Sequence, residues 1–152
     1  MPREIYRYLA DDHERLDALL EHAMSDPENI DMSAYAQFRS GLLKHIGMEE
    51  KILLPAAQRI RGGEPLPVAA KLRLDHGALT ALLVPSPTGS IVAAIRAILK
   101  ANNPIEENPG GIYDQCGELA GAEADQILRQ LQEAPEVRIL PHVDTPFVME
   151  AT

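Results

Sequence analysis

A histidine and a glutamate one helical turn apart, His45 and Glu49, are the residues whose types and spacing most clearly indicate chemistry in this chain. Both fall on a stripe whose members follow one another at intervals of three and four residues, as on one face of a helix. The stripe consists of Tyr35, Phe38, Leu42, His45, Glu49, Ile52 and Ala56. Such a stripe is expected to face a core, where an unpaired neutral polar group costs roughly 2–7 kcal/mol and a charge more. The two residues must therefore bond to each other, to polar groups of other helices or to a metal ion.

A second helical motif occurs once in each half of the chain. The frame D-H-x-x-L-x-A-L-L covers residues 12–20 and again residues 75–83. Each copy places a histidine, first His13 and then His76, on an apolar stripe. The repeat predicts pseudo-two-fold symmetry, with the two histidines opposite each other.

The pattern that contains His45 and Glu49 is repeated as well. His-x-x-x-Glu-Glu from residue 45 is matched by Asn-x-x-x-Glu-Glu from residue 102, so that Asn102 and Glu106 take the equivalent places. The chain therefore reads as a duplicated helical hairpin, in which each hairpin pairs a D-H helix with a helix that carries two glutamates.

The repeated spacing suits a metal centre. Side chains four residues apart on a helix lie one above the other, with Cβ atoms roughly 5–6 Å apart. Such a histidine and glutamate can hold one metal, or the glutamate can bridge two metals while the histidine caps one. Two of these helices facing each other would form a dinuclear carboxylate site in a bundle core. Imidazole and carboxylate without thiolate favour iron, manganese or zinc, and open positions would let O2 or NO reach iron.

The periodicity is helical throughout and predicts an all-α fold. Pro55 should kink or break the second helix near Leu54, and Pro104 with residues 109–111 should interrupt the fourth. Long helices joined by short turns favour an antiparallel up-down four-helix bundle, at residues 1–134, followed by a proline-containing tail without a helix of its own, at residues 135–152. The expected helices cover residues 2–24, 32–61, 66–84, a stretch from about 90 onward, and a further segment at 112–133.

Composition narrows the class of protein. The 152 residues are 45% hydrophobic and 24% charged, which suits one globular domain with a real core. A net charge of −9 argues against a nucleic-acid partner and against an anionic membrane surface. We see no signal peptide and no apolar run long enough to cross a bilayer. A single cysteine, Cys116, excludes an internal disulfide and fits a reducing cytoplasm.

The motifs taken together span about residues 9–114. They are Asp12-His13-x-x-Leu16, His45-x-x-x-Glu49-Glu50-x-x-Leu53-Leu54-Pro55, Asp75-His76-x-x-Leu79 and Asn102-Asn103-Pro104-Ile105-Glu106-Glu107. In this combination the sequence resembles a hemerythrin-like domain of the HHE cation-binding family. The resemblance implies a four-helix bundle with an oxo- or hydroxo-bridged non-haem di-iron centre. It further implies terminal ligands at His13, His45 and His76 and bridging carboxylates at Glu49 and Glu106. Members of the family carry or sense O2, respond to NO or redox state, handle peroxide, or supply iron for iron–sulfur cluster repair.

Three departures from the family pattern bear on the site. Asn102 stands where a fourth histidine is expected, and an amide oxygen is a poor iron ligand beside imidazole, so the site is di-iron, mononuclear, loaded with another metal, or degenerate. Thr80 stands where oxygen-carrying hemerythrins have a second histidine, which argues against reversible O2 transport. The insertion at residues 109–111 loosens the chain just after Glu106.

Two other functions compete with a metal-binding sensor of O2, NO or redox state. One is a helical interaction module without metal, in which hydrogen bonds between histidine and glutamate close the polar core. The other is a peroxidase-like or oxygen-activating enzyme, for which the sequence names no convincing proton donor. The oligomeric state is not indicated by the sequence.

Several further residues have two readings each. Asp12 and Asp75 either orient a histidine ring or lie on the surface, and Glu50 and Glu107 are either solvated or next to the ligands. Tyr113 either lines the site or packs in the core. His142 belongs to the solvated tail unless the tail folds over the bundle and replaces the missing ligand.

Overall fold

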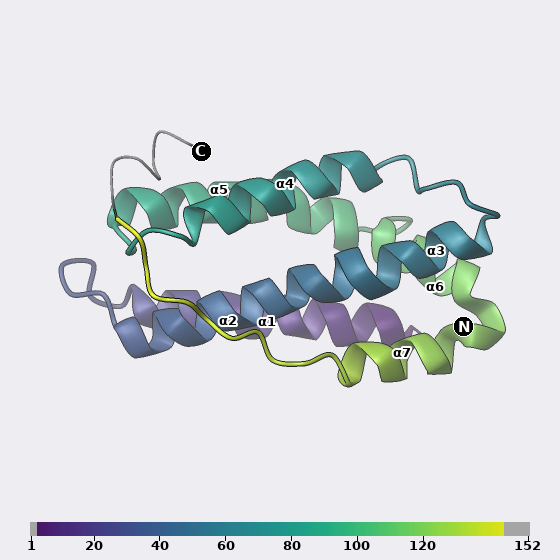
Figure 1. Cartoon of the computed structure of the whole chain (residues 1–152), viewed down its shortest axis with the longest axis horizontal. Coiled ribbons are helices and arrows are strands. Elements are labelled where there is room, and N and C mark those ends of the chain that lie inside the picture. The colour runs from purple at the N-terminus through teal and green to yellow at the C-terminus, as the bar shows by residue number, and fades with distance from the viewer. Residues whose placement is uncertain (1–2, 145–152) are drawn as a thin grey trace.

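The computed structural model describes residues 3–144, and every regular element in that range is a helix (Figure 1). The all-α prediction is therefore confirmed. Four long helices, α1, α2, α4 and α5, lie along the long axis of the molecule, and α6 and α7 gather at the end where the N-terminus lies. The elements are α1 (Glu4–Ala23), α2 (Met32–Met48), the π-helical turn η1 (Glu49–Leu53), α3 (Leu54–Ile60), α4 (Ala69–Leu82), α5 (Gly89–Glu107), α6 (Ile112–Ala120), the 3-10 turn η2 (Gly121–Glu123) and α7 (Ala124–Gln132).

The predicted second helix is three elements in succession, α2, η1 and α3. Pro55 lies in the first turn of α3, where its missing N–H matters least, and the irregularity that it imposes is taken up by the π-helical turn before it. The helix is irregular near Leu54, where the sequence predicted a kink or a break, but the chain stays helical through this point. Turns of π-helix are frequent at functional sites, and this one contains both Glu49 and Glu50.

The prediction that Pro104 interrupts the fourth helix is wrong. Helix α5 continues through it to Glu107, because only one backbone bond is lost and the Asn108 amide still donates to the Pro104 carbonyl at 2.9 Å. The expected break at residues 109–111 does occur. The segment predicted as one helix at 112–133 is divided at Gly121, whose φ of 50° favours glycine.

Two apolar clusters fill the interior, one toward each end of the long helices. The first joins the starts of α1 and α4 to η1, α3, α6 and α7, and the second joins the end of α1 to α2, α4 and α5. His13 lies between Leu9 of the first cluster and Leu16 of the second. His76 lies between Leu72 and Leu79 in the same way. A layer of buried polar residues that includes His13 and His76, called the polar layer below, thus separates the two apolar clusters.

The described part of the tail, residues 135–144, runs back along α2 without forming a helix (Figure 1). The Ser40 hydroxyl donates to the Val137 carbonyl at 2.9 Å, and the Val143 amide donates to the Val84 carbonyl at 3.1 Å. The His142 ring lies 3.3 Å from that same carbonyl, at the end of the helices, and so does not replace a missing ligand. The rest of the predicted tail, residues 145–152, lies outside the described residues.

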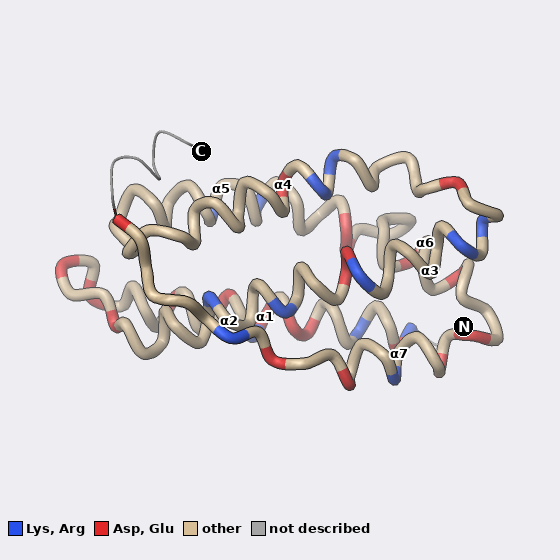
Figure 2. The backbone as a smooth tube through the Cα atoms, in the orientation of Figure 1, with Lys and Arg blue, Asp and Glu red and all other residues tan. Residues whose placement is uncertain are grey.

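Acidic and basic positions are interspersed along the described chain, and acidic residues gather in the loop between α1 and α2 (Figure 2). Between residues 3 and 144, none of the helices combines the length and the apolar character that crossing a membrane requires.

Candidate metal centre

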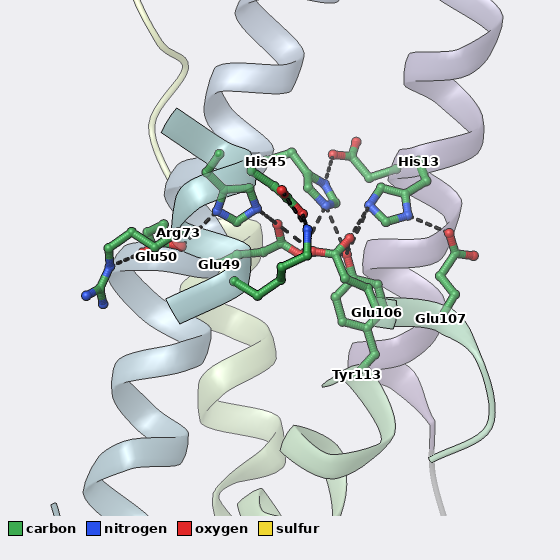
Figure 3. Close-up of polar contacts among 12 residues, drawn as sticks. His13, His45, Glu49, Glu50, Arg73, Glu106, Glu107 and Tyr113 are labelled. Carbon is green, nitrogen blue, oxygen red and sulfur yellow. Dashed lines mark hydrogen bonds and ion pairs between the residues drawn. The ribbon is translucent and has the colours of Figure 1, made fainter. Parts of the chain in front are cut away.

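Four of the predicted ligands converge in the polar layer. One ligand atom from each of His13, His45, Glu49 and Glu106 lies within 4.8 Å of the others, and all four residues are buried. They come from four elements, α1, α2, η1 and α5, and Figure 3 shows their side chains pointing toward one another. The structure therefore brings together a buried group that could hold a metal ion.

His76 reaches the same two glutamates from the other side. Its Nε2 lies 3.1 Å from Glu49 Oε1 and 3.9 Å from Glu106 Oε2. The opposite oxygens face the other ligands: Glu106 Oε1 is 3.1 Å from His13 Nε2, and Glu49 Oε2 is 3.6 Å from His45 Nε2. Each glutamate thus presents one oxygen to each side, the arrangement that bridging carboxylates require.

A carboxylate orients the outer nitrogen of each opposed histidine. His13 Nδ1 lies 2.6 Å from Glu107 Oε2, and His76 Nδ1 lies 2.7 Å from Glu50 Oε2. An ionised carboxylate only accepts, so each Nδ1 carries the proton, and each Nε2 faces the glutamates. This is the usual outer support of a metal-bound imidazole. Each hairpin supplies the supporting carboxylate for the histidine of the other hairpin, so that Glu50 and Glu107, which the sequence left open, lie next to the predicted ligands.

His45 has the same kind of carboxylate support, but Asn102, its counterpart in the repeat, has none. His45 Nδ1 lies 2.8 Å from Asp12 Oδ2. The repeat-related aspartate, Asp75, pairs instead with Lys71, at 3.0 Å from each carboxylate oxygen. In the repeat, Asn102 takes the place of the histidine that Asp75 would orient. Of the two aspartates, only Asp12 has the outer supporting position.

Asn102 is nonetheless part of the polar layer, since its side chain is 2% exposed. Within the described residues its Oδ1 has no hydrogen-bond partner, and neither does Glu106 Oε2. Two unpartnered buried acceptors are unusual, because each forfeits about 1–3 kcal/mol of solvation. A cation between them and His76 would satisfy both atoms. These residues therefore fit a second metal beside the His13–His45 side, with fewer donors. The threonine that replaces a family histidine, Thr80, adds none, because its hydroxyl donates to the His76 carbonyl at 2.8 Å.

Tyr113, which the sequence left undecided, lies at the centre of the group (Figure 3). Its side chain is fully buried, and its hydroxyl donates to Glu49 Oε2 at 2.7 Å. The hydroxyl oxygen of Tyr113 also lies 3.0 Å from the Nε2 of both His13 and His45, and 3.3 Å from Glu106 Oε1. It therefore contacts all four residues that converge.

The insertion expected to loosen the chain after Glu106 instead forms the tight turn that returns Tyr113 to this centre. Gly110 has a φ of 78°, and a Cβ on Gly111 would approach the Ile105 carbonyl oxygen to 2.7 Å. Asp114 ties the turn by accepting from the Gly110 amide at 3.1 Å. Gly110 and Gly111, three and four residues after Glu107, are the sequence signal from which the return of an α6 side chain to the glutamates could have been predicted.

The polar layer holds protons in the absence of a cation. Burial alone would lower the pKa of His45, but the charge of Glu49 and the bond to Asp12 raise that pKa to about 9. Burial also opposes ionisation of both glutamates, yet the charged His45 holds the pKa of Glu49 well below its usual range. The pKa of Glu106 is raised well above normal by burial and by the charge of Glu49. Glu106 is therefore the protonated member of the pair.

We expect the stability of the metal-free protein to fall as pH rises from about 6.5 to about 9. His45 has a raised folded-state pKa, so its contribution is complete below the unfolded value of 6.5 and is lost as pH passes about 9. The raised pKa values of His76 and Glu106 act in the same direction. Denaturant unfolding in the presence of a chelator should show a decline of roughly 1–3 kcal/mol.

The lowered pKa of His13, due to burial and to the nearby His45, does not offset this decline, because its effect ends at the unfolded value of 6.5. The variant His45→Gln should show a shallower pH dependence than the natural chain. A stability that stays level or rises over this range would contradict the proton assignment.

Comparison with protein-family models, with curated proteins and with solved structures found no match to this chain. The case for a function rests on the geometry described above.

Proposed function

We propose that this protein binds two metal ions, preferably iron, in a carboxylate-bridged centre at the middle of a hemerythrin-like, antiparallel four-helix bundle. The centre binds or senses a small diatomic molecule, O2 or NO, or the redox state. One observation carries the proposal. The carboxylates of Glu49 and Glu106 each direct one oxygen toward His13 or His45 and the other oxygen toward His76.

The donor set is compatible with iron. All candidate donors are nitrogen or oxygen, the combination that suits iron and manganese, with zinc as an alternative. The one thiol lies outside the group: Cys116 is buried in the first apolar cluster, and burial together with the charge of Glu49 raises its pKa to about 12. Bound iron would supply an open position for a diatomic ligand and a change of oxidation state.

The two positions are unequal. The His13–His45 position has two imidazoles with outer carboxylates, whereas the other has only His76 beside the shared glutamates and the weak donor Asn102. We expect the first position to fill first and the second to bind more weakly. The poorer donor set also leaves the second position more open to a small ligand.

Metal content tests this function directly. Anaerobic titration of chelator-stripped protein with Fe(II) should reach about two ions per chain in two phases, and the melting temperature should rise with free metal. Mass action predicts a gain of about 2.7 kcal/mol at one hundred times the dissociation constant. Exposure of the loaded protein to O2 or NO should then change its visible spectrum.

The alternative is a helical interaction module that holds no metal. The hydroxyl of Tyr113 favours it, because that group contacts His13, His45 and both glutamates and so closes much of the network without a cation. This alternative predicts a melting temperature that does not respond to Fe(II), Mn(II), Zn(II) or a chelator. Such a result would overturn the metal-binding proposal.

A further inference from the structure

Tyr113 occupies a place that packing alone does not require. Its ring is buried in the first apolar cluster, where phenylalanine would fill the same volume. Its hydroxyl instead extends into the polar layer and lies between 2.7 and 3.3 Å from ligand atoms on four other elements. A hydroxyl that only needed one acceptor would not require this central position.

The distances match those between neighbouring ligands of one metal ion. Bonds of about 2.1 Å from an octahedral ion to nitrogen or oxygen place adjacent ligand atoms about 3.0 Å apart and opposite ones about 4.2 Å apart. The Tyr113 oxygen lies near the adjacent distance from all four atoms. Of the four atoms themselves, His13 Nε2 and Glu106 Oε1 are 3.1 Å apart, and His45 Nε2 and Glu49 Oε2 are 3.6 Å apart.

We propose that Tyr113 is a direct ligand of the ion at the His13–His45 position. The inference rests on the proposed function and extends it by making that position a phenolate site. The ion would be held by the phenol oxygen together with His13 Nε2, His45 Nε2, Glu49 Oε2 and Glu106 Oε1. On binding, the O–H bond of Tyr113 breaks, an oxygen–metal bond forms, and the proton leaves to solvent without any change of oxidation state.

This assignment also explains the asymmetry of the repeat. The second position has Asn102 in the place of an imidazole, while the first has, under this assignment, an anionic oxygen from outside the repeat. Phenolate is a hard anionic donor and stabilises ferric over ferrous iron. The first position should therefore hold Fe(III) tightly, which leaves the weaker second position as the one that loads and releases.

The test uses the spectrum that a phenolate gives on ferric iron. The natural protein, Tyr113→Phe and Tyr35→Phe are loaded with Fe(II), oxidised in air and compared for iron content and visible absorption. Tyr35 is the matched control, because it is equally buried but lies in the other apolar cluster, and its hydroxyl has no partner among residues 3–144. We expect a broad charge-transfer band in the natural protein and in Tyr35→Phe. In Tyr113→Phe we expect the band to be absent and the affinity of the first ion to fall by at least about 10-fold.

Resonance Raman spectra of natural protein made with ring-deuterated tyrosine provide a second measurement, which does not depend on the fold of a variant. Enhanced phenolate modes that shift on deuteration would support ligation. Bound iron without a phenolate band or modes, or a band that persists in a folded Tyr113→Phe, would overturn the assignment and leave the proposed function intact. Failure of the natural protein to bind any iron would overturn both.

Discussion

Replacing Glu49 by glutamine should abolish tight binding at both metal positions. Glutamine keeps the size of the side chain but removes the charge and one of the two acceptor oxygens, so the bridge between the positions is lost. Since outer carboxylates alone are worth about 10–100-fold in metal affinity, the loss of a bridging ligand should exceed about 100-fold at each position. Titration of the folded variant with Fe(II) measures this effect.

Two further glutamate-to-glutamine variants serve as comparisons for Glu49→Gln. Glu50→Gln removes the charge of the carboxylate that supports His76 and should weaken only the second position, by about 10–100-fold. Glu14→Gln changes an exposed residue next to His13 and should leave the metal content unaltered. If Glu49→Gln binds iron as well as Glu14→Gln does, the bridging role of Glu49 is wrong.

The sequence predicted the converging residues because their signal is local. The three histidines and two glutamates lie on stripes with helical spacing, and two repeated motifs indicated that the stripes face each other. Burial of all five confirms this part of the reasoning. Their role as ligands, and the resemblance to hemerythrin, stay predictions that metal analysis must test.

The outer carboxylates were harder to assign, because each acts on a histidine of another helix. Glu107 supports His13 across 94 residues of sequence, and Asp12 supports His45 rather than its own neighbour. Which of two adjacent acidic residues turns inward depends on the π-helical turn and on the end of α5, neither of which hydrophobic periodicity predicts. The same limit applies to Tyr113, whose position depends on the turn at residues 108–111.

The substitution Asn102→His tests whether the weaker position is the damaged copy of the stronger one. Asn102 is the repeat-related counterpart of His45, and Asp75 is the counterpart of Asp12, paired here with the half-exposed Lys71. A histidine introduced at position 102 should therefore be able to bind the second metal ion, with its ring oriented by the carboxylate of Asp75. We expect the affinity of the second ion to rise by about 10–100-fold, so that the two phases of the titration approach each other.

The metal-free form of Asn102→His should be less stable by about 1–3 kcal/mol, because a larger ring enters a packed and already protonated layer. Opposite signs for the two effects distinguish a restored ligand from a general change in packing. Asn103→His, one residue further along α5 and off the buried stripe, is the control and should leave the second phase unchanged. The double variant Asn102→His with Asp75→Asn should lose most of the gain. If the double variant binds as tightly as the single one, the ring is not held by Asp75, and the two halves of the chain do not share one metal-binding design.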